Sequence, residues 1–296
     1  MATIINKEAI VIQSIEGFLP ASNALDILRL DLCHPIVSGN KWFKLNGLQE
    51  AMQAAQKKSI ISFGGAWSNH LVALAYYAHH YQIPCKAIVR GHYEVLSPSL
   101  LFAQEHGMEL HFVDATHYSA LKKDASSLQS KYPDAYILPE GGNSEMGVKG
   151  ASAIASFLTK SYDYVCVSVG SGTTFAGLRR ALSIDTHLIG FAPMKGGIYL
   201  KDEMEAYIPA IDKTSYTILD AYHFGGFGKI TPELISFMND CYQRYALPLD
   251  RVYTAKMMWG ISELIQTQQL SSNARIAAIH TGGLQGNQSI AQELFF

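Results

Sequence analysis

Short apolar runs alternate with amphipathic stretches along most of this 296-residue chain. Apolar runs that end in glycine or a polar turn predict buried strands, and helical spacing of apolar residues predicts helices. Strands are expected at SIISFGG (59–65), CKAIVRG (85–91), MELHFVD (108–114), AYILPEGG (135–142), DYVCVSVG (163–170), HLIGFAP (187–193), YTILDAYH (216–223), RVYTA (251–255) and ARIAAIHTGG (274–283), after an opening segment with the alternating LRLDL (28–32); helices are expected at 45–57, 70–82, 231–245 and 256–268. This alternation predicts an α/β fold with parallel sheets and crossover helices.

The length corresponds to about two domains of roughly 150 residues each. We expect residues 1–44 and 146–296 to form a large domain and residues 45–145 to form a smaller one. Hydrophobic residues make up 48% of the chain and charged residues 16%, with a formal net charge of -2. Without a basic excess, nucleic acid is an unexpected partner.

The compartment is inferred from the cysteines and from the apolar runs. The four cysteines are scattered singly, with no CxxC pair, which is typical of a reducing, intracellular environment. No run of about 18 apolar residues and no leader with an apolar core and a cleavage site is present. The sequence therefore predicts a cytoplasmic protein without a membrane span.

Several predicted strands end in glycine-rich turns: FGGAWSN (63–69), PEGGNS (139–144), SVGSGTT (168–174) and IHTGG (279–283). In open parallel sheets, ligands bind outside the carboxyl ends of the strands, where glycine admits a close approach and helix N-termini present free N–H groups. We expect the four turns to face one cleft.

The turn Gly170-Ser171-Gly172-Thr173-Thr174 is the strongest candidate for an anion site. Its backbone N–H groups, small residues and following helix could hold a phosphate. The turn matches neither the P-loop nor the GxGxxG pattern. The alternative is an ordinary strand-to-helix turn capped by Thr173.

Two further loops carry candidate chemistry. In VSGNKWFKL (37–45), Lys41 follows a Ser-Gly-Asn turn at the start of a predicted helix, where burial would lower its pKa and favour the neutral amine that forms a Schiff base. Lys44, one turn later, could equally be an ordinary solvated lysine. Ser68 and Asn69 begin another helix, where helix capping is their alternative role. His70, His79 and His80 lack metal-ligand spacing, so no metal site is expected.

A phosphate turn, a Schiff-base lysine and a nearby asparagine together indicate pyridoxal 5′-phosphate, and the chain resembles a known family of enzymes that use it. It is similar to the 1-aminocyclopropane-1-carboxylate deaminase and D-cysteine desulfhydrase family, within the fold type II (tryptophan synthase beta-like) pyridoxal-phosphate enzymes. Six ordered motifs carry the resemblance: SGNKWFKL, SFGGAWSNH, ILPEGGNSEMGVKG, SVGSGTTFAGL, LDRVYTAKMMWGI and HTGGLQGN. They span nearly the whole chain, and the family implies two open, mostly parallel sheets flanked by helices and a homodimer.

The resemblance also implies roles for individual residues. Lys41 would form the Schiff base and shuttle the α-proton, Asn69 would bond the cofactor's 3-hydroxyl oxygen, and Thr254 would face the pyridine nitrogen. The cofactor would lie in the large domain, with its phosphate held by residues Gly170, Ser171, Gly172, Thr173 and Thr174. The substrate amino acid, on the side of the small domain, would meet Ser68 and Tyr253 as catalytic residues and would also contact Trp67, Asn69, His70 and Phe227.

The chain departs from the deaminase pattern at two important positions. The deaminases have a glutamate where this chain has Thr254, whose neutral hydroxyl could donate to an unprotonated ring nitrogen and would favour β-elimination. Phe227 stands where the family usually has a tyrosine, so a hydroxyl that could act as acid, base or nucleophile is lost. Phe43 and Trp67 replace an arginine and a glutamine, which makes the expected substrate pocket more aromatic.

The resulting hypothesis is an α,β-elimination of D-cysteine to pyruvate, ammonia and sulfide. The first alternative is 1-aminocyclopropane-1-carboxylate deaminase, giving 2-oxobutanoate and ammonia. Others are a serine/threonine dehydratase or β-replacement synthase on the same fold, a non-catalytic protein that binds pyridoxal phosphate or an amino acid, and a nucleotide-binding module. The last lacks an adenine or ribose motif.

Overall fold

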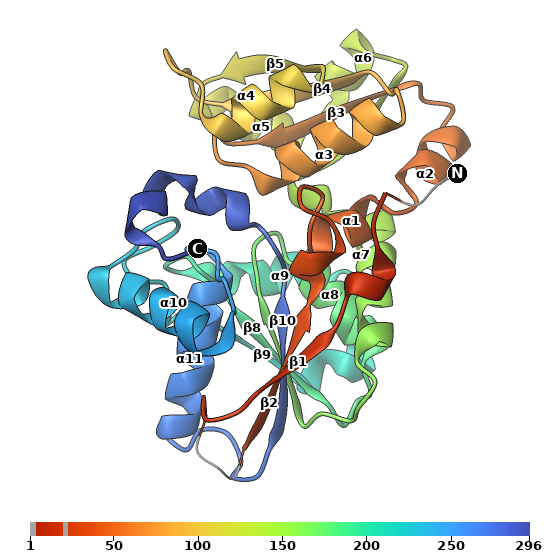
Figure 1. The fold of residues 1–296 in the computed structure, drawn as a ribbon. Coiled ribbons are helices and arrows are strands. Elements are labelled where there is room, and N and C mark those ends of the chain that lie inside the picture. Colours follow the sequence, from red (N-terminus) through yellow and green to blue (C-terminus); the bar gives the residue numbers. More distant parts are fainter. Residues whose placement is uncertain (1–3, 20–22) are drawn as a thin grey trace.

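The computed structural model describes residues 4–19 and 23–296, and it contains two sheets (Figure 1). The larger sheet has six strands in the order β1-β2-β10-β7-β8-β9. Its strands are β1 (Ile12–Ile15), β2 (Ala24–Arg29), β7 (Tyr164–Ser168), β8 (His187–Phe191), β9 (Tyr216–Leu219) and β10 (Arg275–His280). Only the edge strand β1 is antiparallel to its neighbour among these strands.

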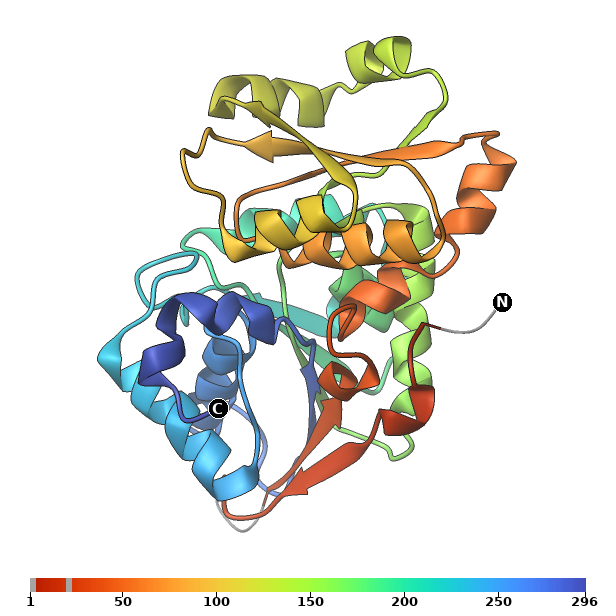
Figure 2. The same ribbon diagram turned by 45° about the horizontal axis from the view of Figure 1, so that its top comes forward.

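The smaller sheet has four parallel strands in the order β5-β4-β3-β6. They are β3 (Ser59–Gly64), β4 (Cys85–Arg90), β5 (Met108–Val113) and β6 (Ala135–Ile137). The helices α3 (Asn69–His80) and α4 (Pro98–Glu105) lie on the face toward the larger sheet, whereas α5 (Ala115–Lys123) and α6 (Ser126–Lys131) lie on the other face (Figure 2). Helices thus cover both faces, as buried parallel strands require.

Helices also cover both faces of the larger sheet (Figure 1). One face is packed against α10 (Pro232–Tyr245) and α11 (Thr254–Gln266), and the other against α7 (Glu145–Ser152) and α8 (Thr173–Ala181). The short helices α1 (Asn40–Leu45) and α2 (Leu48–Ala54) lead from the larger sheet to the smaller one, and α9 (Leu200–Glu205) follows β8. The α/β class and the two mostly parallel sheets are therefore confirmed.

One local prediction is wrong. RVYTA (251–255) is a turn followed by the start of α11, because the Asp250 carboxylate accepts the N–H groups of Tyr253 and Thr254 at 2.8 Å each and thereby caps a helix. In the opening segment, β2 ends at Arg29 and residues 30–33 form a 3₁₀ turn.

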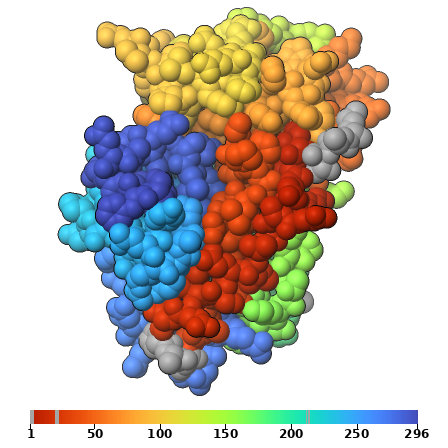
Figure 3. Space-filling model, in the orientation of Figure 1, coloured from red at the N-terminus to blue at the C-terminus, as the bar shows by residue number. Residues whose placement is uncertain are grey.

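The segment around the smaller sheet, orange to yellow in Figure 3, lies against both the N-terminal segment (red) and the C-terminal segment (blue). The largest buried cluster includes side chains from both parts, among them Leu74 and Ala103 from α3 and α4 and Val167 from β7. The four strands of the smaller sheet all lie between α2 and α7 in the chain, and these limits are close to the expected domain limits. Boundaries at 44/45 and 145/146 remain a proposal.

Candidate active site

The four glycine-rich turns meet at the carboxyl ends of their strands. A Cβ on Gly141, in the second turn, would lie 2.7 Å from Ser171 Oγ in the third, and one on Gly283, in the last, would lie 2.7 Å from Asn69 Nδ2 in the first. The turns thus touch in pairs across the two sheets. Their convergence on one site was expected from the sequence, and the structure brings them together there.

Gly39 fixes the point at which the chain enters α1. Its φ is +66°, and a Cβ on it would lie 1.9 Å from the carbonyl oxygen of Thr281. Both the left-handed backbone and the close approach require glycine at this position. The contact between Gly39 and Thr281 therefore fixes the start of α1 beside the IHTGG turn.

Lys41 lies in the first turn of α1 and is half-buried. Its Nζ donates to Asn40 Oδ1 at 2.7 Å, and Asn40 Nδ2 donates to Thr174 Oγ1 at 2.8 Å. Burial lowers the pKa of Lys41 to about 8, although the negative charge of Asp250 acts in the opposite direction. A substantial fraction of neutral amine is therefore present near pH 8, which a nucleophilic lysine needs.

Lys44 is a second lysine of the site that the sequence did not single out. Its side chain is buried, and Nζ donates to the Gly141 carbonyl at 3.1 Å and to Ser171 Oγ at 3.3 Å. Burial, followed by repulsion from Lys41, lowers its pKa well below the usual range. The spacing of three residues from Lys41 placed it on the same helix face, which was the available signal.

The phosphate-loop candidate forms the turn between β7 and α8. Gly172, with φ +75°, is the N-cap of α8, so the N–H groups that follow it have no partner within the helix. Ser171 Oγ lies 2.9 Å from Thr173 Oγ1, and both Thr173 and Thr174 are buried. Gly170 lies beside Tyr253, since a Cβ there would be 3.2 Å from the tyrosine ring.

The turn after β3 presents four of the expected residues. Ser68 caps α3, with Oγ accepting from the Leu71 N–H at 3.2 Å. Asn69 Nδ2 reaches the Gly283 carbonyl at 3.5 Å, while its buried Oδ1 has no partner in the described chain. Trp67 is 48% exposed.

His70 is buried behind this turn. Its Nε2 lies 2.9 Å from Ser62 Oγ, which itself donates to the Leu138 carbonyl at 2.9 Å. Burial, followed by the positive charges of Lys44 and Lys41, lowers the pKa of His70 to about 3. The imidazole is therefore neutral at physiological pH, and one of its nitrogens is engaged by the core.

The start of α11 brings Tyr253 and Thr254 to the site. The buried Thr254 hydroxyl donates to Asp250 Oδ2 at 2.8 Å and accepts the Asp250 N–H at 2.7 Å. Its proton is therefore directed at the Asp250 carboxylate. Burial raises the pKa of Tyr253 far above its usual range, so that the hydroxyl keeps its proton.

Phe227 reaches the site from the loop after β9. Its ring lies 6.0 Å from that of Tyr253 in an edge-to-face contact, and the residue is 58% exposed. Phe227, Tyr253 and Gly170 thus form a continuous row from the exposed loop to the phosphate-loop candidate.

The residues present fit an anionic, polar cofactor such as pyridoxal phosphate. Lys41 and Lys44 have no carboxylate within 4.0 Å of Nζ among residues 4–19 and 23–296. A bound anion would favour the charged form of both amines, which burial disfavours in its absence. The side-chain amide of Asn69 retains hydrogen-bonding capacity in a buried position, where an unbonded polar group is costly.

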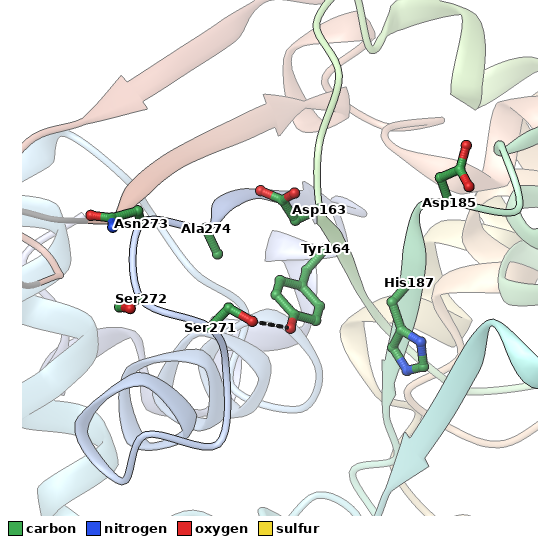
Figure 4. Close-up of a pocket in the computed structure, with 8 residues that line it drawn as sticks. All are labelled: Asp163, Tyr164, Asp185, His187, Ser271, Ser272, Asn273 and Ala274. Carbon is green, nitrogen blue, oxygen red and sulfur yellow. Dashed lines mark hydrogen bonds between the residues drawn. The ribbon is translucent and has the colours of Figure 1, made fainter.

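A surface pocket of about 310 Å³ lies elsewhere (Figure 4). Asp163, His187 and Ala274 are at or next to the first residues of β7, β8 and β10, so the pocket opens at the amino ends of these strands. The glycine-rich turns are at the opposite ends, and the pocket is therefore separate from the candidate site.

None of the helices in the described ranges is both long enough and apolar enough to span a membrane.

Comparisons with known proteins agree with this geometry. The sequence profile described as "Pyridoxal-phosphate dependent enzyme" matches residues 26–282. A putative 1-aminocyclopropane-1-carboxylate deaminase from Pyrococcus horikoshii is 29% identical, over 88% of this chain and 84% of its own. The Arabidopsis thaliana protein named bifunctional D-cysteine desulfhydrase/1-aminocyclopropane-1-carboxylate deaminase, mitochondrial, is 25% identical, over 90% of this chain and 74% of its own.

A solved structure has a similar fold across the full chain. The crystal structure of an ACC deaminase homologue superposes with a TM-score of 0.83 at 26% identity, covering 99% of this chain and 94% of the other. The relatives carry the names that the six motifs led us to expect, so the resemblance and the cofactor class are confirmed. The chain belongs to the family of pyridoxal-phosphate dependent enzymes.

Proposed function

We propose that this enzyme is a lyase that converts D-cysteine into pyruvate, ammonia and sulfide by α,β-elimination. The observation that carries the choice is the neutral side chain at the start of α11, in contrast to the carboxylate that the deaminases have at this position. Thr254 is fully buried there and presents a hydroxyl rather than a carboxylate. On the family resemblance this side chain borders the cofactor's ring nitrogen, and a weaker electron sink suits a substrate with an α-hydrogen and a good leaving group.

Bound pyridoxal phosphate would supply the electron sink for breaking bonds at the substrate Cα. Lys41 would supply the amine that attaches the cofactor, and its lowered pKa lets the same group accept and return the α-proton. Asn69 would orient the ring through its side-chain amide, whose buried Oδ1 has no partner in the described residues. Residues 170–174 would hold the phosphate together with Lys44, which already contacts Ser171.

The substrate would lie between the turn after β3 and the row formed by Tyr253 and Phe227. Ser68 would bind its carboxylate, and Tyr253, whose hydroxyl stays protonated, could donate a proton to the departing sulfur. Trp67 and Phe227 would enclose the side-chain end of a small substrate and reduce its contact with water.

Deamination of 1-aminocyclopropane-1-carboxylate is the second candidate. It is favoured by the hydrogen bond from Thr254 to the Asp250 carboxylate, because a hydroxyl that donates to an anion can only accept from the ring nitrogen. Compared with a hydroxyl that donates to the nitrogen, this arrangement would favour a protonated and more electron-withdrawing ring, although the sink stays weaker than one paired directly with a carboxylate. The named deaminase relatives add to this candidate.

The test is a substrate panel with the pyridoxal-phosphate-loaded protein. D-cysteine, L-cysteine, D-serine, L-serine, L-threonine and 1-aminocyclopropane-1-carboxylate are supplied separately, and sulfide, pyruvate and 2-oxobutanoate are measured. We expect sulfide and pyruvate in equal amounts from D-cysteine, with activity abolished by Lys41→Ala. A kcat/KM for 2-oxobutanoate release from 1-aminocyclopropane-1-carboxylate that is higher than the kcat/KM for D-cysteine would favour the deaminase. A loaded protein that turns over no amino acid would favour a non-catalytic binder.

A further inference from the structure

Lys256 is a buried lysine that the proposed chemistry does not use. It lies in the first turn of α11 and is 1% exposed. Its Nζ lies 2.8 Å from the His223 carbonyl, 2.9 Å from the Gly226 carbonyl and 3.3 Å from the Pro193 carbonyl. An ammonium has three donors, so these three backbone oxygens use all of them.

The carbonyls come from segments that follow two neighbouring strands. Pro193 follows β8, whereas His223 and Gly226 belong to the loop after β9, which we call the Phe227 loop (residues 223–229). Burial lowers the pKa of Lys256 to about 8, against the opposing influence of Asp250, so the amine is mostly charged at neutral pH. No carboxylate within 4.0 Å of Nζ pairs with it in the described ranges.

The Phe227 loop has a backbone that needs external support. Phe224, Gly225, Gly226 and Gly228 all have positive φ values, from 50° to 134°. Glycine gains most freedom when a loop loosens, so a loop of this composition is costly to hold in one conformation. Its internal backbone bonds are few: Gly226 donates to the His223 carbonyl at 3.0 Å, and Lys229 donates to the Gly226 carbonyl at 3.1 Å.

We propose that Lys256 is a positioning residue whose ammonium holds the Phe227 loop by its carbonyls and thereby keeps Phe227 against Tyr253 at the substrate side of the site. The residue that holds the loop and the residue that Phe227 contacts both lie at the start of α11, because Tyr253 directly precedes this helix and Lys256 lies in its first turn. Only the consequence for the substrate rests on the proposed function. The clamp itself is a property of the free protein.

A neighbouring cation reinforces the same link. Arg251, just before α11, donates from Nη2 to the Gly228 carbonyl and from Nη1 to Ser289 Oγ at 2.6 Å. The loop is thus held at three carbonyls, of residues 223, 226 and 228, by side chains from residues 251 and 256. Loss of Lys256 should free the first half of the loop more than the second.

The experiment compares Lys256→Ala, Lys256→Arg and the control Lys229→Ala, an exposed lysine of the same loop. Hydrogen exchange of the peptide covering 220–230 is followed by mass spectrometry, with and without 100 mM ammonium chloride. In Lys256→Ala we expect exchange to rise about 10- to 100-fold and KM for the amino acid to rise about tenfold, with kcat little changed. Lys256→Arg should retain most protection, and Lys229→Ala should resemble the wild type.

Ammonium should restore part of the protection and of KM in Lys256→Ala, because it can occupy the space left among the three carbonyls, whereas tetramethylammonium is too large. Unchanged exchange and KM in Lys256→Ala would overturn the proposal. So would protection lost equally in the loop and in α10 with no rescue by ammonium, since Lys256 would then be a general core residue. If the protein has no lyase activity, the exchange measurement still tests the clamp.

Discussion

Lys41 and Lys44 lie one helical turn apart, yet their surroundings give them different chemistry. Among residues 4–19 and 23–296, Lys41 Nζ has a single hydrogen-bond partner, the side chain of Asn40, and its pKa is lowered to about 8. Lys44 is bound to the Gly141 carbonyl and to Ser171. The first amine is available for reaction, and the second is directed at the phosphate-loop candidate.

The reactivity of Lys41 should follow its lowered pKa. The neutral amine is the reactive form, so acylation of Lys41 in the cofactor-free protein should increase with pH and reach half its maximum near pH 8. The exposed Lys149 serves as the comparison in the same samples. Peptide mapping after brief labelling at a series of pH values measures both. Equal midpoints would contradict the burial of Lys41.

Replacement of Lys44 should weaken binding of the phosphate group specifically. A charge-assisted hydrogen bond contributes about 1.5–3 kcal/mol, so Lys44→Met should reduce affinity for pyridoxal phosphate roughly 10- to 100-fold. Affinity for pyridoxal, which lacks the phosphate, should change little. Absorbance titrations of both aldehydes measure this, with Lys149→Met as the exposed control. An equal loss for the two aldehydes would show that Lys44 does not act on the phosphate.

The sequence predicted the types of residue at the site better than their hydrogen bonds. The motifs indicated Lys41, Asn69 and the 170–174 turn, which lie around one site. Lys44 was not singled out because burial of a lysine depends on contacts from distant segments, here Gly141 and Ser171. The direction of the Thr254 hydroxyl was likewise fixed by Asp250, and no pattern in the sequence reveals it.

At the scale of elements, the start of α1 depends on the contact between Gly39 and the Thr281 carbonyl. Gly39→Ala adds left-handed strain and an overlap with backbone, so the free energy of unfolding should fall by roughly 2–5 kcal/mol. Gly17 provides a matched control, since its φ is +70° but a Cβ there would meet no atom of the described residues within 4 Å.

Gly17→Ala should cost only about 1–2 kcal/mol, the strain alone. Urea unfolding of the two variants measures the difference, and cofactor affinity should fall only in Gly39→Ala. Equal losses of stability in both variants would mean that the close approach to Thr281 contributes nothing.

Most elements were predictable because their apolar runs and helical spacing are strong. The failure at RVYTA shows the limit: β-branched and aromatic residues there resemble a strand, but capping by Asp250 starts a helix instead. A short segment of this kind is decided by one side chain. The conformation of longer elements such as α10 and α3 is decided by many side chains together.

At the scale of the whole molecule, the site joins the two sheets. Lys41 and residues 170–174 belong to the part around the larger sheet, whereas Asn69 and Gly141 belong to the part around the smaller one. The α/β class and the approximate division of the chain followed from the alternation of elements. The meeting of the glycine-rich turns from both parts was expected too, whereas the individual side-chain contacts between the parts were not, since they depend on residues far apart in the sequence.

Cofactor binding should therefore stabilise both parts together. At 100 times the dissociation constant, pyridoxal phosphate should add about 2.7 kcal/mol of stability. Hydrogen exchange should slow in peptides from β3 and from β7 alike. The pocket at the amino ends of the strands provides the internal control, and its lining segment 271–274 should slow no more than other remote loops. Slower exchange confined to the larger sheet would contradict a shared site.

The central claim is that Lys41 carries the cofactor, and borohydride reduction followed by peptide mapping tests it most directly. Lys44 and Lys256 serve as internal comparisons because both are buried lysines with lowered pKa values. The loaded protein should be yellow, lose that colour on reduction and yield one pyridoxyl-modified peptide, with the modification at Lys41. Modification at Lys44 or Lys256, or no stable modification in a loaded protein, would contradict the account.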